Sequence, residues 1–250
     1  MSIGVKFNRK TMKGIVNRFL SLALQKRCRY IYARVLGLFR VAYFPAANAL
    51  DKKLLKYLGD RERGTFIEAG ANDGISQSNT WYLERYKNWR GVLVEPVPTM
   101  AKLCGRFRLS PVENVALGEM KDTGSTITLY YGALMTVAAD ATQNGLEGGS
   151  SLQHATEGAA WNSEQVYEFQ CKVTTVSDLM EKHNLGRVNL LSLDVEGYEL
   201  RVLRGVDFTK HLIEYILIET NQIDFVVAEL KNTHRLLEQF SFHDYLFRAI

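Results

Sequence analysis

Apolar runs of four to eight residues recur along the chain from residue 65 onward, and helical stretches separate most of them. The runs are TFIEA (65–69), GVLVEP (91–96), VENVAL (112–117), STITLYYG (125–132), VNLLSLDV (188–195) and YILIET (215–220). Continuous runs of this length, rich in β-branched residues, indicate strands that are buried on both faces. Strands that alternate with helices predict a mostly parallel α/β sheet with right-handed crossovers and helices on both faces.

The remaining segments complete this pattern less clearly. The predicted helices are residues 76–86, 99–108, 197–205 and the long stretch 224–240. Residues 242–250 alternate weakly and predict a final edge strand. Residues 132–165 are rich in Gly, Ala and Ser and show no sustained period, so they predict an irregular insertion of the kind that often carries function.

The charge of the chain is divided between an arm and a body. Residues 1–50 contain ten Lys and Arg and no Asp or Glu, although the chain as a whole carries only +4. We therefore expect a basic, mainly helical extension at residues 1–62 and one domain at residues 63–250. The arm predicts an anionic partner, either a membrane surface or a polymer other than nucleic acid. The alternative is a solvated extension that packs on its own domain.

The location of the protein follows from what the arm lacks. Its longest apolar run, FLSLAL, is too short for a membrane span or for the core of a signal peptide. Three cysteines without C-x-x-C spacing disfavour a disulfide framework and a zinc site. The sequence predicts a cytoplasmic protein whose arm contacts the inner membrane surface, although apolar residues and cations do not separate cleanly on a helical wheel.

Candidate chemistry begins at the turn after the first predicted strand. Gly70 and Gly74 allow positive φ and a close backbone approach to a ligand. Asn72 stands where a dinucleotide fingerprint requires its second glycine, so a pyrophosphate is disfavoured. Glu68, at the end of the strand, would repel phosphate and attract a positively charged ligand. S-adenosylmethionine, with its sulfonium and amino group, is such a ligand.

Glu95 ends the next predicted strand, and it follows the glycine turn at the spacing expected of a ribose-binding acid. An acid there can accept hydrogen bonds from both ribose hydroxyls. The alternative is that Glu95 only caps the following helix.

The blocks FIEAGANDGISQSNTWYLE, WRGVLVEPVP, NVALG and LLSLDVEGYELRVLRGVD resemble the FkbM family of S-adenosylmethionine-dependent methyltransferases. The resemblance covers roughly residues 63–245. It implies a Rossmann-like class I methyltransferase fold and O-methylation of a hydroxyl, often on a glycan, glycolipid or small molecule. The basic arm lies outside the family core, and the early end of the chain predicts a short or absent seventh strand.

The resemblance also implies roles for individual residues. The turn residues Gly70, Ala71, Asn72, Asp73 and Gly74 would line the methionine part of the cofactor, and Glu68 would hold its ammonium directly or through water. Glu95 would bind the ribose, and Asn114 and Ala116 would lie near the adenine. Pro96, Ser78 and Asn79 are also expected in the cofactor site. Asp194 and Glu196 would face the transferring methyl group.

Asp194, Glu196 and Glu199 follow a buried strand, at the sheet edge where catalytic side chains converge. We expect Asp194 to act as the base or to orient the acceptor, with Glu196 and His154 as the other catalytic candidates. Three alternatives stay open for these acids. Glu196 could complement a helix dipole, Glu199 could pair with Arg201 or Arg204, and Asp194 and Glu196 could share Mg²⁺, although we predict no metal.

Two other classes of function compete with the enzyme. A non-catalytic scaffold or trafficking factor could keep the same fold and lose the chemistry. A nucleotide-dependent oxidoreductase is disfavoured because the G-x-G-x-x-G fingerprint is missing.

Overall fold

The computed structural model describes residues 22–38, 41–141, 150–162 and 164–250. The chain divides between Tyr43 and Phe44 into two units. The second unit begins at Phe44 rather than at the predicted residue 63. Helix α3 (Leu50–Leu58) explains the difference, because Leu50, Leu54 and Leu58 are buried in the core of that unit.

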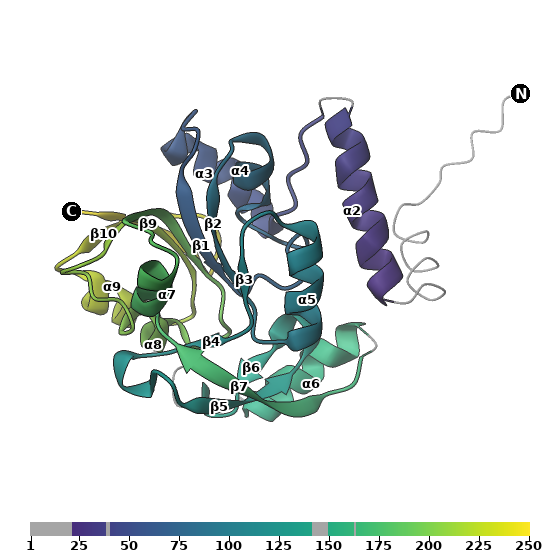
Figure 1. Cartoon of the computed structure of the whole chain (residues 1–250). Helices are drawn as coiled ribbons and strands as arrows, with labels where there is room; N and C mark the ends of the chain where they lie inside the picture. Colours follow the sequence, from purple (N-terminus) through teal and green to yellow (C-terminus); the bar gives the residue numbers. More distant parts are fainter. Residues whose placement is uncertain (1–21, 39–40, 142–149, 163) are drawn as a thin grey trace, which may run out of the picture. The chain divides into compact units, whose positions relative to one another are not determined.

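A seven-stranded sheet forms the centre of the second unit, in the order β10-β11-β9-β8-β1-β2-β3 (Figure 1). The strands are β1 (Thr65–Ala69), β2 (Arg90–Val94), β3 (Val112–Glu113), β8 (Arg187–Leu193), β9 (Leu212–Glu219), β10 (His234–Gln239) and β11 (Asp244–Ala249). The five strands from β9 to β3 run parallel, and β11 is antiparallel to both of its neighbours. The predicted α/β fold is confirmed.

Helices cover both faces of this sheet because successive strand side chains point to opposite sides. On one face, α3, α4 (Trp81–Tyr86) and α5 (Pro98–Phe107) pack on Phe66 and its neighbours. On the other face, α7 (Val176–Lys182), α8 (Glu199–Leu203) and α9 (Ile223–Leu230) pack on Ile67 and its neighbours. The sheet order reverses between β1 and β8, the point at which ligands of open α/β sheets bind.

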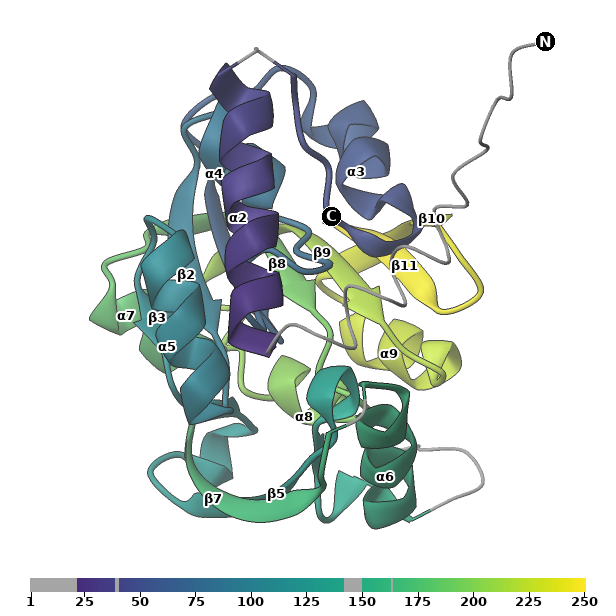
Figure 2. The same ribbon diagram turned by 90° about the vertical axis from the view of Figure 1, so that its right-hand side faces the viewer.

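A smaller four-stranded sheet, in the order β4-β7-β5-β6, lies beyond the carboxyl ends of the central strands (Figure 2). Its strands are β4 (Ala116–Leu117), β5 (Thr126–Tyr131), β6 (Val137–Ala138) and β7 (Tyr167–Thr174), and α6 (Ser151–Asn162) packs against it. The short helical turns η1 (Ala47–Ala49), η2 (Met120–Asp122) and η3 (Ala133–Met135) complete the unit. The segment 132–165, predicted to be irregular, therefore contains η3, β6 and α6.

Three further sequence predictions were wrong. The predicted helix 224–240 ends at Leu230, and its second half is strand β10. The predicted edge strand 242–250 is interior: β11 is a full strand between β9 and β10, so the seventh strand is neither absent nor short. The run 112–117 divides at Asn114 into β3 and β4, which pair with different strands. In each case the local sequence is compatible with more than one secondary structure or strand position. Pairing with strands that are distant in the sequence determines which one forms.

The first unit contains α2 (Leu22–Leu38), and Tyr32 contacts Tyr43 edge-on within it. No helix in the described ranges is both long enough and apolar enough to cross a bilayer.

Candidate functional site

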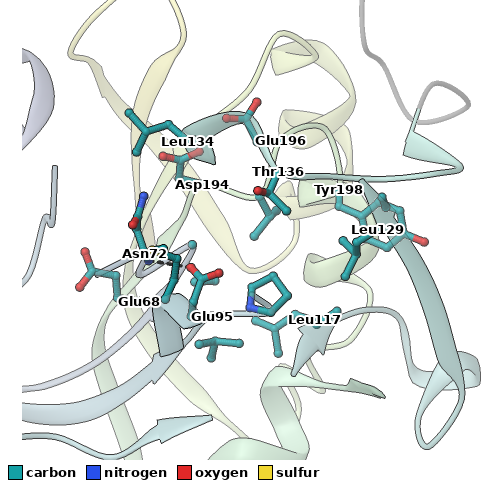
Figure 3. Close-up of a pocket in the computed structure, with 18 of the residues that line it drawn as sticks. Glu68, Asn72, Glu95, Leu117, Leu129, Leu134, Thr136, Asp194, Glu196 and Tyr198 are labelled. Carbon is teal, nitrogen blue, oxygen red and sulfur yellow. Dashed lines mark hydrogen bonds between the residues drawn. The ribbon is translucent and has the colours of Figure 1, made fainter. Parts of the chain in front are cut away.

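A cavity opens at the carboxyl ends of β1, β2 and β8, and the smaller sheet closes it from the other side (Figure 3). Its lining includes Glu68, Gly70, Asn72, Asn79, Glu95, Pro96, Ala116, Ile127, Leu129, Leu134, Asp194, Glu196 and Tyr198. The cavity thus brings together predicted residues from four separate blocks of the sequence. The apolar residues of η3 in this lining were not predicted, because the insertion shows no period that would place them. Ile127 and Leu129 lie in β5, a strand that was predicted, but its position beside the cavity was not.

The backbone of the turn after β1 fixes its position through hydrogen bonds to the end of β2. Gly70 has a φ of +82°, and a Cβ there would lie 2.0 Å from the Asp194 carbonyl oxygen, so only glycine fits. The N–H groups of Gly70 and Ala71 both donate to the Val94 carbonyl, at 3.1 and 3.0 Å. Only Gly70 and Asn72 of the five predicted turn residues line the cavity.

The other turn residues build the loop instead of lining it. Asp73 is buried and its carboxylate accepts from the Ile75 and Ser76 N–H groups, at 2.9 and 2.7 Å. Gly74 has a φ of +81°, and a Cβ there would lie 2.7 Å from Cγ of Arg108. The tight G-A-N-D-G sequence is therefore needed as much for packing inside the protein as for an open ligand site.

Glu95 is buried and joins two loops. Its Oε2 accepts from the Asn72 N–H at 2.7 Å, and its Oε1 accepts from the Val97 N–H at 2.8 Å. Asn114 does not line the cavity. Its Nδ2 donates to the Glu95 and Pro96 carbonyls, at 2.9 and 2.8 Å, and so fixes the loop that carries them.

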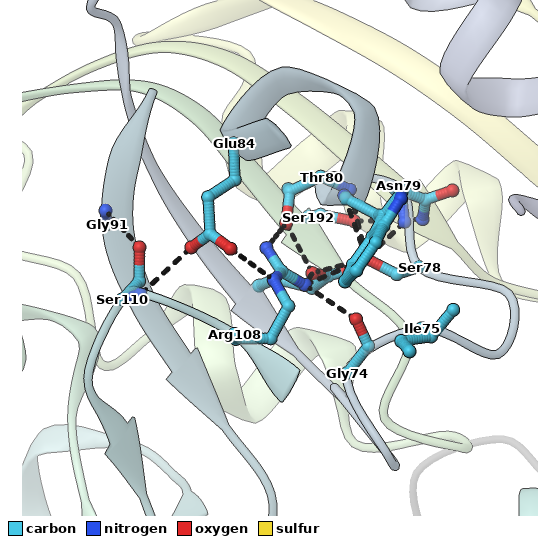
Figure 4. A network of polar contacts seen from close by, with 12 residues as sticks. Gly74, Ile75, Ser78, Asn79, Thr80, Glu84, Gly91, Arg108, Ser110 and Ser192 are labelled. Carbon is cyan, nitrogen blue, oxygen red and sulfur yellow. Dashed lines mark hydrogen bonds and ion pairs between the residues drawn. The ribbon is translucent and has the colours of Figure 1, made fainter. Parts of the chain in front are cut away.

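Glu68 lies in a buried polar network with Arg108, a residue that sequence reasoning missed. Figure 4 shows Arg108 at the centre of this network, between Glu84 and Thr80. The Glu68 carboxylate accepts from the Asn79 N–H at 2.8 Å, the Ser78 hydroxyl at 3.0 Å, the Thr80 hydroxyl and the Arg108 guanidinium at 3.2 Å. The Ser78 hydroxyl also accepts from the N–H of Trp81, the first residue of α4, and Ser78 does not line the cavity.

Arg108 also pairs with Glu84, at 2.9 Å, and its side chain has no exposed surface. Burial alone would raise the pKa of Glu84, but the Arg108 guanidinium and the hydrogen bonds from Ser110 and Leu109 together hold the pKa below its usual range. The sequence indicated that Glu68 needs a partner, because an acid at the end of a buried strand requires a buried cation or several hydrogen-bond donors. It did not indicate that Arg108 is this partner, because nothing local connects the two residues.

Asn79 contributes an unpaired acceptor to the cavity. Its Nδ2 donates to the Ser192 hydroxyl at 3.0 Å, whereas its Oδ1 is buried and has no hydrogen-bond partner among the described residues. An orphaned buried acceptor beside a cavity suits a ligand that brings a donor.

Acids gather at the ends of β8 and β9. Burial and the nearby Glu219 and Glu196 carboxylates raise the pKa of Asp194 well above its usual range. Burial, followed by Glu196 and Asp244, raises the pKa of Glu219 to about 8. The Asp194 carboxylate lines the cavity, and no described cation pairs with it.

His154 lies on α6, not in a loop, and its Nε2 is 2.8 Å from Oε2 of Glu196. The hydrogen bond with Glu196 raises the pKa of His154. Glu196 lines the cavity, whereas His154 is not one of the lining residues and contacts Glu196. Glu196 also has a φ of +52°, a conformation that costs free energy for a residue with a side chain and that is enriched at functional sites.

Two of the alternative roles for these acids, an ion pair of Glu199 and a metal ion shared by Asp194 and Glu196, can now be compared with the observed contacts. Glu199 pairs with neither Arg201 nor Arg204; its Oε1 accepts from the Gly197 N–H at 2.9 Å, and burial raises its pKa to about 7. In the described part of the chain, the side chains that converge closely enough to share a metal ion are Glu219, His243 and Asp244, and this group includes neither Asp194 nor Glu196.

The raised acid pKa values predict a fall in stability with rising pH. Because native Glu219 keeps its proton up to about pH 8 and the unfolded chain loses it near 4.5, the unfolded state is favoured increasingly across this window. We expect a lower urea midpoint at pH 8 than at pH 5, and a flatter profile for Glu219→Gln. Glu214→Gln is the control: because the native pKa of Glu214 is lowered to about 2, its replacement should lower the midpoint evenly above about pH 4.5 and change the slope of the profile only below that pH. A profile that Glu219→Gln leaves unchanged would contradict the assignment.

A family model identifies the family of this chain. The model of the methyltransferase FkbM domain matches residues 68–248. Methyltransferase 1 of Beauveria bassiana (strain ARSEF 2860) is 42% identical over 71 residues, which cover 26% of this chain and 28% of that protein. The chain thus spans well under half the length of this curated relative.

Two solved structures superimpose on the chain at low identity. Methyltransferase FkbM from Methylobacillus flagellatus KT superimposes with a TM-score of 0.43 and 13% identity, over 76% of this chain and 44% of that chain. A TehB-like SAM-dependent methyltransferase from Corynebacterium glutamicum ATCC 13032 Kitasato gives a TM-score of 0.39 and 8% identity, over 91% and 99%.

Proposed function

Because the chain belongs to the FkbM methyltransferase family, we propose that it transfers a methyl group from S-adenosylmethionine to a hydroxyl of a saccharide, glycan or glycolipid. The charge of the cavity carries this proposal. Four acids, Glu68, Glu95, Asp194 and Glu196, line it, and none of its described lining residues is Lys, Arg or His. Such a lining favours a cofactor with positive charge and disfavours a pyrophosphate.

The residues present fit this cofactor. Asn79 Oδ1, buried and unpaired, offers an acceptor to the ammonium of its methionine part. Both Glu68 oxygens already accept hydrogen bonds from the chain, so we assign Glu68 to shaping this end of the cavity. Glu95 is held by two N–H groups in a position to accept from ribose hydroxyls. Pro96 and Ala116 supply apolar surface for the adenine.

Bound there, S-adenosylmethionine supplies a methyl group on a positively charged sulfur, which is a good leaving group. The chain then has two tasks. The turn and Glu95 hold the donor in line with the acceptor, and such positioning contributes on the order of 7–11 kcal/mol to a bimolecular reaction. Asp194 accepts the proton of the acceptor hydroxyl, and the Glu196–His154 pair orients the acceptor from the same side.

The experiment that tests the proposal uses the full chain and S-adenosylmethionine with a labelled methyl group. A glycan extract from cells that lack the gene supplies the acceptor. We expect label in the glycan and, by mass spectrometry, one added methyl per modified site. Titration calorimetry with S-adenosylhomocysteine separates the enzyme from a scaffold: a scaffold would show no affinity even at high cofactor concentration.

Glu95→Ala is expected to weaken S-adenosylhomocysteine binding by about tenfold or more, because a charge-assisted acceptor for the ribose is lost. Calorimetry measures the change. Glu95→Gln is the matched variant: it keeps the size and one acceptor oxygen, so its loss should be smaller. If Glu95→Ala binds normally, the residue only ties Asn72 to Val97.

A further inference from the structure

Helix α2 presents an exposed apolar stripe. Leu24, Cys28, Ile31 and Val35 follow the i, i+4, i+7, i+11 spacing that places residues on one helix face. Leu24, Ile31 and Val35 are 43%, 51% and 41% exposed, and Cys28 is exposed as well. Tyr32, 56% exposed, extends the stripe on one side. Exposed apolar surface arranged in this way marks an interaction site.

The surroundings of the stripe carry one sign of charge. Arg27 is exposed and follows Leu24 by three positions, which places it at the border of the stripe. The stretch 1–50 contains no Asp or Glu to balance its ten cations. Cations at the border of an apolar face are typical of helices that lie in the surface of an anionic membrane, where the aliphatic stems stay in the apolar layer and the charges reach the headgroups.

We propose that α2 docks on an anionic phospholipid bilayer, with Leu24, Ile31 and Val35 entering the boundary between headgroups and acyl chains. An anionic polymer would bind the cations but would leave the apolar stripe in water. A second copy of α2 would bring like charges together, with no acidic residue within residues 1–50 to offset them. The inference does not depend on the proposed methyl transfer.

Co-sedimentation of the full chain with vesicles tests the proposal. We expect binding to phosphatidylcholine vesicles that contain phosphatidylglycerol, little binding to phosphatidylcholine alone, and weaker binding as salt is raised. The double variant Ile31→Gln, Val35→Gln keeps the net charge, and it should lower the partition coefficient by about tenfold or more. Phe225→Gln is the control: Phe225 is 65% exposed on α9, and its replacement should change nothing.

Cys28 permits a second measurement. It is exposed, whereas Cys104 and Cys171 are buried, so an environment-sensitive dye should label it selectively. We expect a blue shift of the dye on addition of the anionic vesicles, and no labelling of Cys28→Ser. The proposal is overturned if the wild-type chain does not sediment with anionic vesicles at low salt, if the double variant binds like wild type, or if the dye does not shift.

Discussion

Replacement of Asp194 by asparagine is expected to lower turnover by about 10²–10⁴-fold and to leave the affinity for S-adenosylhomocysteine nearly unchanged. The carboxylate lines the cavity at the end of β8, beside Gly70, and its raised pKa makes it a stronger base than an ordinary aspartate. An amide of the same size cannot take the proton of the acceptor. The labelled-methyl assay and calorimetry measure the two quantities.

Stability provides an independent readout for the same variant. Because burial, and after it the neighbouring carboxyl groups, disfavour a charge on Asp194, its neutralisation should keep or raise the urea midpoint while activity falls. Glu219→Gln removes one of the charges that raise the pKa of Asp194, so it should also keep or raise the midpoint, but it should lower turnover far less because the Asp194 carboxylate remains. Unchanged turnover in Asp194→Asn would remove the base-or-orienter role, and a lower midpoint would show that the loss of activity follows from misfolding.

Arg108→Met is expected to lower the free energy of unfolding by about 3–5 kcal/mol. The variant keeps much of the side-chain volume but leaves Glu68 and Glu84 buried without their cation. Urea denaturation measures the effect. We also expect weaker binding of S-adenosylhomocysteine, because the same network positions Asn79 through the Glu68 carboxylate.

Two further variants make the Arg108 result specific. Arg204→Met removes a half-exposed partner of Glu229 and should cost less than about 1 kcal/mol. Addition of Glu84→Gln to Arg108→Met should restore part of the lost stability, because one uncompensated carboxylate disappears. A loss below about 1 kcal/mol for Arg108→Met alone would mean that the two carboxylates do not depend on the guanidinium.

Strand prediction succeeded where the strands are buried and parallel. The runs that became β1, β2, β8 and β9 are apolar on both faces, which leaves a sequence signal that packing does not alter. β10 was missed because HRLLEQ suits a helix as well as a strand, and its pairing with β11 decides the matter. β7 was missed because most of its residues are not buried and so leave no continuous apolar run.

The residues of the candidate site also fall into those that the sequence places and those that only the tertiary structure places. Glu95 and Asp194 end parallel strands, so the sequence by itself determined that they would meet at one edge of the sheet. The tertiary structure alone decided that Asp73 turns inward, that Asn114 holds a loop, and that His154 lies behind Glu196. It also brought Arg108 to Glu68 across 40 positions of the chain. Strand ends are set by local apolar periodicity, whereas the partner of a buried charge is set by the packing of segments that no local pattern connects.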